Sequence, residues 1–302
     1  MHRPAFSLEV FPPRRHAPIG TIYDTLDGLE DVDPDFISVT YGTGRSADRT
    51  ATLRIARTIH DEYRIPVVAH LTAQYLDRNQ ADETLDAFEA AGVHAVLALR
   101  GDRDPDRPPT DVFAHASDLT AYIADTHPDM TIYGACYPEC HPQSKNRKDD
   151  IGALKLKVDA GAKRLISQLF YDDDDFLSFL EIARASGIAV PIEAGIMPVT
   201  DAAQVGRMVR LCSSRVPRSL SRILERWGDD QSALREAGII YASQQITDLV
   251  AQGVDGIHLY TMNRPAITRR IWANTRGLFA TGTNAIDGTD ADDDGRQAGC
   301  AH

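Results

Sequence analysis

Residues 36–72 read FISVTYGTGRSADRTATLRIARTIHDEYRIPVVAHLT, and this stretch decides the fold. Two short apolar runs, FISVTYG (36–42) and VVAHLT (67–72), flank a segment at 48–63 whose apolar residues recur at helical spacing. A strand, a helix and a second strand in this order predict a βαβ unit, which places the two strands parallel in one sheet.

Six further apolar runs repeat the pattern: FSLEVF (6–11), AVLALRGD (95–102), TIYGACYPE (131–139), RLISQLFYD (164–172), VPIEAGIMP (190–198) and GIHLYTMNR (256–264). Stretches of helical periodicity separate them. The interval before the last run is long enough for an extra helix at 218–227 ahead of the one at 231–252. Eight such repeats predict an α/β fold, a single closed (β/α)8 TIM barrel, whose chemistry lies at the C-terminal ends of the strands.

Composition sets the domain organisation. The chain has 302 residues, of which 43% are hydrophobic and 25% charged, as in an ordinary globular protein. We interpret residues 1–280 as one barrel domain. Residues 281–302 hold five Asp and one large apolar residue, which cannot bury enough surface to fold, so we expect a disordered acidic tail.

The net charge and the cysteine content limit the classes of partner and of metal site that we expect. A net charge of −12 argues against nucleic acid or an anionic membrane as a partner. No apolar run reaches membrane-spanning length and no signal-peptide core opens the chain, so we expect a cytoplasmic protein. The segment C-x3-C-H at 136–141 lacks a second pair of ligands, and we predict no metal site.

Glu9 is the first candidate for chemistry. Alternation in the first strand puts Ser7, Glu9 and Phe11 on one face and Leu8 and Val10 on the other. If Leu8 and Val10 pack against helices, Glu9 faces the barrel interior, where a carboxylate is costly unless it is paired or protonated. Glu9 is then either half of a structural ion pair or a general acid with a raised pKa, and the strand context favours the acid.

Other polar residues lie where strands should end. Arg100 and Asp102 flank Gly101, which permits close backbone approach to a flat ligand, although a loop salt bridge explains the pair equally well. His70 points inward by alternation, and a lone His is more often structural. Gln168 carries an amide that suits the edge of a heterocycle or a hydrogen bond to backbone in the core.

Nine motifs occur in the order and at the intervals of one enzyme family: F-S-L-E-V-F-P-P-R, S-V-T-Y-G, H-L-T, L-A-L-R-G-D, Y-P-E-C-H-P, L-K-x-K-V-D-A-G-A, Q-L-F-Y-D, G-I-M-P-V and Y-T-M-N-R. From Phe6 to about Leu278 the chain resembles the 5,10-methylenetetrahydrofolate reductases of the bacterial type.

The resemblance implies an FAD-dependent barrel in which NAD(P)H reduces the flavin, and methylenetetrahydrofolate then takes the hydride in a ping-pong reaction that feeds methionine synthesis. It places the catalytic glutamate on Glu9 and a flavin-tuning aspartate on Asp102. It places flavin contacts on Thr40, Tyr41, His70, Arg100, Gly101, Asp102, Tyr137, His141, Asp150 and Lys157, and folate or nicotinamide contacts on Glu9, Gln168, Gln204 and Arg264.

The loop at 142–148 contains Lys145, Arg147 and Lys148 and leads into the helix that carries Asp150 and Lys157. Its positive charge suits the pyrophosphate of FAD. We expect a homo-oligomer, and the choice between NADH and NADPH stays open.

The chain departs from the family pattern at several contacts. Ala153 and Leu156 stand where polar flavin contacts are common, and Met208 replaces an aromatic that covers the stacked ligand. The chain also ends soon after the barrel, so inhibition by S-adenosylmethionine through a C-terminal regulatory domain is not expected.

Two other functions are compatible with parts of this sequence. One is another flavin barrel, such as a proline-dehydrogenase-like oxidoreductase, which would need a pair of carboxylate-binding arginines that the sequence does not offer near the flavin. The other is a catalytically silent barrel that binds folate or flavin for a partner. Retention of both Glu9 and Asp102 argues against the silent barrel.

Overall fold

The computed structural model describes residues 3–13, 20–41, 49–102, 106, 108–110, 112–212 and 214–280. Within this part, parallel strands close into a barrel in the order β1 to β8. The strands are β1 Ala5–Val10, β2 Phe36–Val39, β3 Val67–Thr72, β4 Ala95–Leu99, β5 Thr131–Cys136, β6 Arg164–Ser167, β7 Ile192–Ile196 and β8 Gly256–Tyr260. The predicted acidic tail lies outside the described residues.

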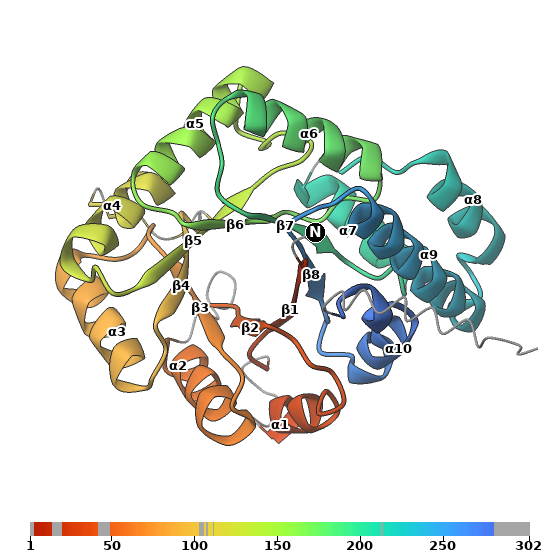
Figure 1. Cartoon of the computed structure of the whole chain (residues 1–302), viewed down its shortest axis with the longest axis horizontal. Helices are drawn as coiled ribbons and strands as arrows, with labels where there is room; N and C mark the ends of the chain where they lie inside the picture. Colours follow the sequence, from red (N-terminus) through yellow and green to blue (C-terminus); the bar gives the residue numbers. More distant parts are fainter. Residues whose placement is uncertain are drawn as a thin grey trace, which may run out of the picture.

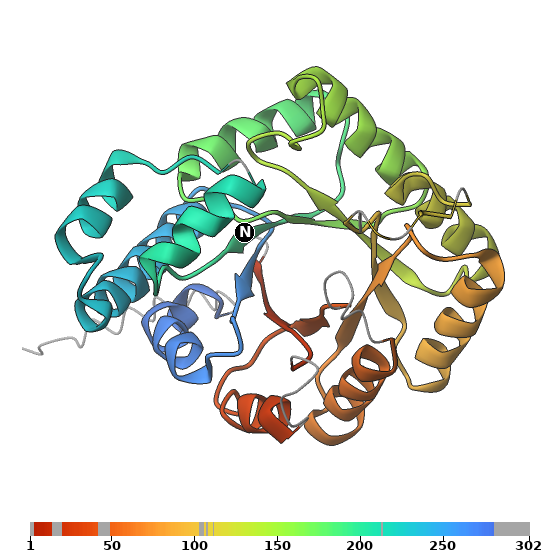
Figure 2. The same cartoon turned by 180° about the vertical axis from the view of Figure 1, so that it is seen from behind.

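Helices surround the barrel in the alternating order that the sequence predicts (Figure 1). They are α1 Gly20–Asp27, α2 Arg49–Thr58, α3 Arg78–Ala90, α4 Ala116–Thr126, α5 Arg147–Asp159, α6 Asp173–Ala185, α7 Ala202–Cys212, α8 Arg218–Trp227, α9 Gln231–Ala251 and α10 Pro265–Thr275. The extra helix is α8, which packs against α9 at the periphery of the barrel (Figure 2). No helix in the described ranges combines the length and apolarity needed to cross a bilayer.

Two element boundaries differ from the sequence pattern. The helix expected at 48–63 is α-helical only to Thr58 and continues as a π-helical turn, η2 Ile59–Tyr63, which Arg64 ends in the left-handed region with φ of 58°. The apolar runs in the sequence also extend beyond the C-terminal ends of the strands. For example, β4 ends at Leu99, three residues before Asp102. Residues after the last ladder pair are free of sheet pairing and form the rim where a site can lie.

The β1–β8 pairing closes the sheet. Leu8 lies opposite Ile37 of β2 and Leu259 of β8. Leu8 and Val10 are fully buried in the core between strands and helices, as alternation predicts. The residues of opposite parity fill the barrel interior, in an apolar cluster made of Phe36, Val68, Leu97, Tyr133 and Ile166. The single closed barrel is therefore confirmed.

Gly92 follows the C-terminal end of α3, where glycine is common because it adopts the left-handed conformation freely. Its φ is +74°, and a Cβ built there would overlap the His60 ring in the π-helical turn η2. Gly187 has a similar φ of +79° after α6, but its Cβ would meet open space. Both positions therefore require a positive φ. A Cβ would meet a neighbouring side chain at Gly92 but not at Gly187.

We predict that Gly92→Ala lowers the free energy of unfolding more than Gly187→Ala does. Both substitutions force an L-residue into the left-handed region, at a cost of roughly 1–2 kcal/mol. Only Gly92→Ala must also displace the His60 ring, which adds about 1 kcal/mol or more. Urea unfolding of the two variants measures the difference, and equal losses would show that the His60 ring moves at no cost.

Candidate active site

Glu9 lies at the C-terminal end of β1, where the register places it beside Ser38 of β2 and Tyr260 of β8. Its side chain is 18% exposed, and its Oε2 lies 3.6 Å from His70 Nε2 and 3.8 Å from His258 Nε2. In the described part of the chain no Lys or Arg forms an ion pair with it. The carboxyl therefore faces two imidazoles at the open end of the barrel.

The backbone of Glu9 is held by the segment that follows β8. The backbone N and Oγ1 of Thr261 both donate to the Glu9 carbonyl oxygen, at 3.2 and 2.6 Å. Asn263 accepts a hydrogen bond from the Phe11 N–H and donates one to the Phe11 carbonyl. Met262 and Asn263 adopt positive φ angles of 52° and 51°, a strained turn of the kind that functional sites retain. Sequence reasoning did not single out Asn263.

His70 is 6% exposed at the end of β3. Burial lowers its pKa from 6.5 to about 4; the His258 ring adds to this decrease and the Glu9 carboxylate opposes it. The imidazole is therefore neutral at neutral pH. Its Nε2 has no hydrogen-bond partner among the described residues. A buried ring nitrogen without a partner is costly, and a bound ligand would remove that cost.

A second unpartnered buried atom lies on the same side of the barrel. Gln74 follows β3, is 5% exposed, and its Oε1 accepts no hydrogen bond within the described residues. Gly101 after β4 has φ of +88°, and a Cβ there would lie 3.0 Å from Thr72 Cβ. Two buried polar atoms without a partner in the described residues, together with the positive-φ backbone at Gly101, are consistent with a site for a flat heterocycle such as the predicted flavin. Gln74 was not predicted, and nothing in its sequence context marks it.

Arg100 and Asp102 do not pair with each other in the described structure. The Arg100 guanidinium donates to Gln143 Oε1, and Asp102 is exposed. The loop salt bridge that the sequence left open is therefore not formed. Tyr137 packs edge-on against His141, with ring centroids 4.6 Å apart, and burial raises the pKa of the Tyr137 phenol to about 12.

Asp150 and Lys157 on α5 lie beside this pair. Asp150 is 9% exposed and accepts hydrogen bonds from Ser144 Oγ and from the His141 N–H. Lys157 Nζ donates to the carbonyl of Ala135 in β5. Burial lowers the pKa of Lys157, against the opposing effects of Cys136 and Asp150. An ammonium held by one carbonyl retains two donors for an anion.

Thr40 and Tyr41 follow β2. The Thr40 N–H donates to the Val10 carbonyl, and the Thr40 carbonyl accepts from Thr52 Oγ1, so its backbone is fixed at the end of the barrel. Tyr41 is 6% exposed and belongs to the main hydrophobic core. Its ring is thus part of the packing beneath the site.

The predicted substrate residues form a second group. Arg264 donates to Thr200 Oγ1, and Thr200 Oγ1 in turn donates to Gln204 Oε1 at 3.4 Å. Gln204 is 5% exposed, and its amide nitrogen lies 3.4 Å from Met197 Sδ. Gln168 Oε1 accepts from the Leu169 N–H, which leaves the Gln168 amide N–H groups as donors.

Within the described residues, Cys136, Cys140 and His141 do not bring three ligand-type atoms within 4.8 Å of one another. Cys136 and Cys140 are free, and burial raises the pKa of Cys136 to about 12, which keeps it a thiol. Elsewhere, Asp86, Glu89 and His127 bring ligand-type atoms within 4.8 Å of one another, but Asp86 is exposed and its Oδ1 already pairs with His127 Nε2.

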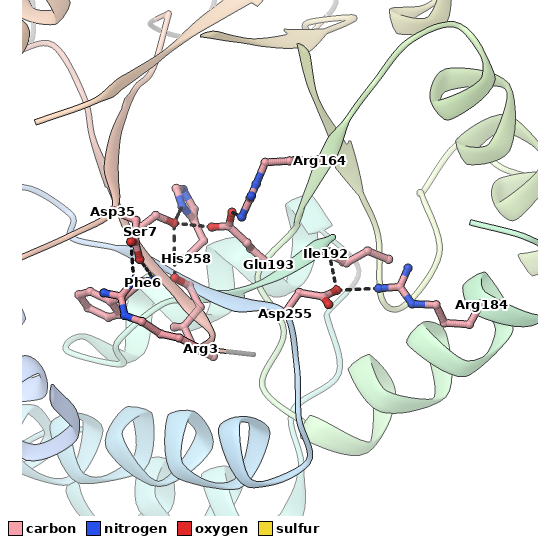
Figure 3. A network of polar contacts seen from close by, with 11 residues as sticks. Arg3, Phe6, Ser7, Asp35, Arg164, Arg184, Ile192, Glu193, Asp255 and His258 are labelled. Carbon is pink, nitrogen blue, oxygen red and sulfur yellow. Dashed lines mark hydrogen bonds and ion pairs between the residues drawn. The ribbon is translucent and has the colours of Figure 1, made fainter. Parts of the chain in front are cut away.

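A polar chain inside the barrel was missed by sequence reasoning (Figure 3). Arg164 donates to Glu193 Oε1 at 3.0 Å, and Ser7 Oγ lies 2.6 Å from Glu193 Oε2. Ser7 Oγ also lies 2.7 Å from Nδ1 of His258, the ring that faces Glu9. The signal was present, because Glu193 interrupts the apolar β7 as Glu9 interrupts β1.

Comparison with known proteins places the chain among its relatives. The family described as methylenetetrahydrofolate reductase matches residues 1–276. Similar proteins include methylenetetrahydrofolate reductase (NADH) 1 of Arabidopsis thaliana, 34% identical over 275 residues, which cover 86% of this chain and 46% of that protein. The 5,10-methylenetetrahydrofolate reductase of Escherichia coli (strain K12) is 32% identical over 265 residues, 88% of each chain. The chain thus spans about half the length of the plant relative.

Among solved structures, an uncharacterised protein from Clostridium thermocellum, described as binding two copies of 5-methyl-5,6,7,8-tetrahydrofolic acid, matches with a TM-score of 0.57. The match covers 92% of this chain and 95% of that one at 16% sequence identity. At this identity the likeness supports the barrel fold alone.

The pKa of His70 predicts a pH dependence of stability. Between pH 6.5 and about 4 the unfolded chain protonates this histidine and the folded chain does not, so stability falls as pH falls through that window. The loss amounts to roughly 3 kcal/mol. We expect His70→Gln to flatten the dependence by about this amount in urea unfolding at stepped pH. His94→Gln, an exposed histidine, serves as control, and equal slopes for wild type and His70→Gln would contradict a neutral buried His70.

Proposed function

Since this chain belongs to the methylenetetrahydrofolate reductase family, we propose that it reduces 5,10-methylenetetrahydrofolate to 5-methyltetrahydrofolate with electrons from NAD(P)H, passed through FAD in a ping-pong reaction. The observation that carries the proposal is the Glu9 carboxyl, which lies at the C-terminal end of β1 against two histidines and without a Lys or Arg partner in the described residues. Such a carboxyl suits a proton donor better than a structural ion pair.

The substrate explains why a proton donor is needed. Methylenetetrahydrofolate holds its one-carbon unit in a five-membered ring that bridges N5 and N10. Hydride cannot add until the C–N10 bond breaks, and N10 leaves readily only as a protonated amine. The Glu9 carboxyl would give its proton to N10, and the resulting carboxylate would stabilise the cation at N5. The neutral His70 beside it adds no positive charge to oppose that cation.

FAD, when bound, supplies the hydride carrier between nicotinamide and folate. The residues proposed to hold it lie at or after the ends of β2, β3, β4 and β5 and on α5. His70 Nε2 and Gln74 Oε1 offer unused polar atoms, and Gly101 offers bare backbone for the ring system. Asp102 would place a negative charge beside the flavin. Tyr137, His141, Asp150 and Lys157 would contact the remainder, with Arg100, Thr40 and Tyr41 completing the proposed set.

Substrate recognition is proposed for the group on the other side of the barrel. The Gln168 amide nitrogen can donate to an acceptor on a pterin or nicotinamide ring, because its oxygen is already used by Leu169. Arg264 and Gln204, joined through Thr200, present a guanidinium and an amide to the same ligands. NADH is the donor to test first, because plant relatives carry it in their names. Methionine synthesis as the use of the methyl group, and a homo-oligomeric state, stay predictions.

We predict that Glu9→Gln slows the folate half-reaction by about 10²–10⁴-fold, the loss expected when a general acid is removed. Flavin reduction by NAD(P)H needs no such acid and should survive within about tenfold. Stopped-flow absorbance of the flavin follows each half-reaction separately. Glu181→Gln, on the exposed face of α6, should leave both unchanged. Equal slowing of both half-reactions would make Glu9 structural, and a purified protein without a flavin spectrum would favour a silent barrel.

We predict that Lys157→Met weakens FAD binding by roughly ten- to a hundredfold, because it removes one charge-assisted contact to phosphate and keeps the length of the side chain. Lys155→Met is the matched control, since Lys155 pairs with Asp159 on the exposed side of the same helix. Flavin fluorescence during titration of the apoprotein gives both affinities. The same affinity in both variants would place Lys157 outside the flavin site.

A further inference from the structure

We propose that His258 is a positioning residue for Glu9, held in its Nδ1–H tautomer by a buried hydrogen-bond chain that begins at Arg164 and passes through Glu193 and Ser7. In that tautomer His258 presents the lone pair of Nε2 to Glu9 and favours the protonated carboxyl. The inference rests on the proposed role of Glu9 as a general acid, and it assigns a function to the interior chain in Figure 3.

Which group donates and which accepts at each step of this hydrogen-bond chain follows from Glu193, its buried carboxylate. Glu193 has no exposed surface, and the Arg164 guanidinium donates to its Oε1 at 3.0 Å. A carboxylate held by a guanidinium can only accept hydrogen bonds. Its second oxygen lies 2.6 Å from Ser7 Oγ, so the Ser7 hydroxyl must donate to it. The alternative acceptor for Ser7, the Ile257 carbonyl, is farther away at 3.4 Å and would leave a buried carboxylate oxygen unsatisfied.

The tautomer of His258 follows from Ser7. Once the single proton of Ser7 points to Glu193, the Ser7 oxygen can only accept a hydrogen bond from His258 Nδ1, 2.7 Å away. His258 has no exposed surface, so no solvent competes for this contact. Nδ1 therefore carries a proton, and in the proposed tautomer Nε2 carries a lone pair. One ionised residue thus fixes the direction of two hydrogen bonds in series, from Ser7 to Glu193 and from His258 to Ser7.

The Nε2 lone pair faces two groups. Ser38 Oγ lies 3.3 Å away and Glu9 Oε2 lies 3.8 Å away. The second distance is too long for a hydrogen bond, but catalytic contacts are often long before substrate binds. A protonated Glu9 can donate to Nε2, whereas an ionised Glu9 would meet a lone pair and be repelled. When Glu9 has given up its proton, the Ser38 hydroxyl can satisfy Nε2 instead.

The other titratable groups around Glu9 do not replace His258. Among the described residues these are His70 on β3 and Tyr260 on β8. The Tyr260 hydroxyl already donates to the Ser167 carbonyl at 2.7 Å, and burial raises the pKa of this phenol well above 10. His70 is neutral, but no hydrogen bond to a charged residue fixes which of its nitrogens carries the proton. Of the two histidines beside Glu9 in the described structure, only His258 is connected to a carboxylate that sets its tautomer.

Neutron diffraction of the deuterated wild-type protein at neutral pH tests the chain without any substitution. We expect a deuteron on His258 Nδ1 directed at Ser7 Oγ, a deuteron on Ser7 Oγ directed at Glu193, and none on His258 Nε2. A deuteron on Nε2, alone or together with one on Nδ1, would overturn the proposal whatever the activity of the protein.

The pH profile of the folate half-reaction tests the role. In Glu193→Gln the amide can donate to Ser7, so Ser7 can donate to Nδ1 and the His258 proton can move to Nε2. An Nε2–H donates to the Glu9 carboxylate and favours the ionised, inactive form. We expect the high-pH decline of the rate to move down by about one to two pH units, and the rate above both midpoints to fall roughly ten- to a hundredfold. Flavin reduction should not change.

Two further variants complete the test. Ser7→Ala breaks the same chain without leaving Arg164 unpaired and should move the profile in the same direction if Glu193→Gln fails to fold. Thr120→Val also removes one fully buried hydroxyl, on α4 outside the barrel, and should leave the profile in place. A folded Glu193→Gln or Ser7→Ala with an unmoved profile would overturn the positioning role. A wild type with the expected deuterons but no reduction of methylenetetrahydrofolate would overturn the proposed function and leave the tautomer established.

Discussion

The parallel pairing of β1 with β8 is the constraint on which the site depends. It removes the open edges that an eight-stranded sheet would otherwise present, and it brings the first and last strands of the chain into register. Because all strands run in one direction, their C-terminal ends share one rim. Glu9, His70 and Gln168 come from strands far apart in sequence and reach that rim only because the ring is closed.

The barrel interior is polar where an apolar packing would have been more stable. Burying Glu193 beside the partly exposed Arg164 costs desolvation energy that their attraction does not reliably recover, and apolar residues of similar volume are often at least as stabilising. What such an ion pair can supply is a fixed direction for the hydrogen bonds that its carboxylate accepts. A hydroxyl or an imidazole alone can orient its proton in either sense, whereas one that is hydrogen-bonded to a fixed carboxylate cannot. The unfavourable burial is therefore consistent with a requirement for one proton arrangement beside Glu9.

The fold was readable from sequence because strand and helix periods differ and glycines such as Gly92 mark helix ends. Alternation in β1 also placed Glu9 inward with no knowledge of its neighbours. The pairing of Ser7 with Glu193 and His258 was not readable, because it joins β1, β7 and β8 through the shear of the closed barrel. Periodicity shows which side chains of a strand face the barrel interior. It does not show which side chains of different strands lie at the same level along the barrel axis.

The turn after β8 shows how the site keeps its shape. Two successive L-residues, Met262 and Asn263, in the left-handed region cost roughly 1–2 kcal/mol each. The side chains of Asn263 and Thr261 donate hydrogen bonds to the backbone carbonyls of Phe11 and Glu9, and these bonds hold the turn against β1. The ends of β1 and β8 therefore behave as one body. Arg264 follows this turn directly, so the guanidinium proposed to bind substrate and the carboxyl proposed to protonate it lie on two backbone segments that these hydrogen bonds join. A substrate held by Arg264 then meets Glu9 at a constant separation, which is the geometric condition for proton transfer to one chosen nitrogen.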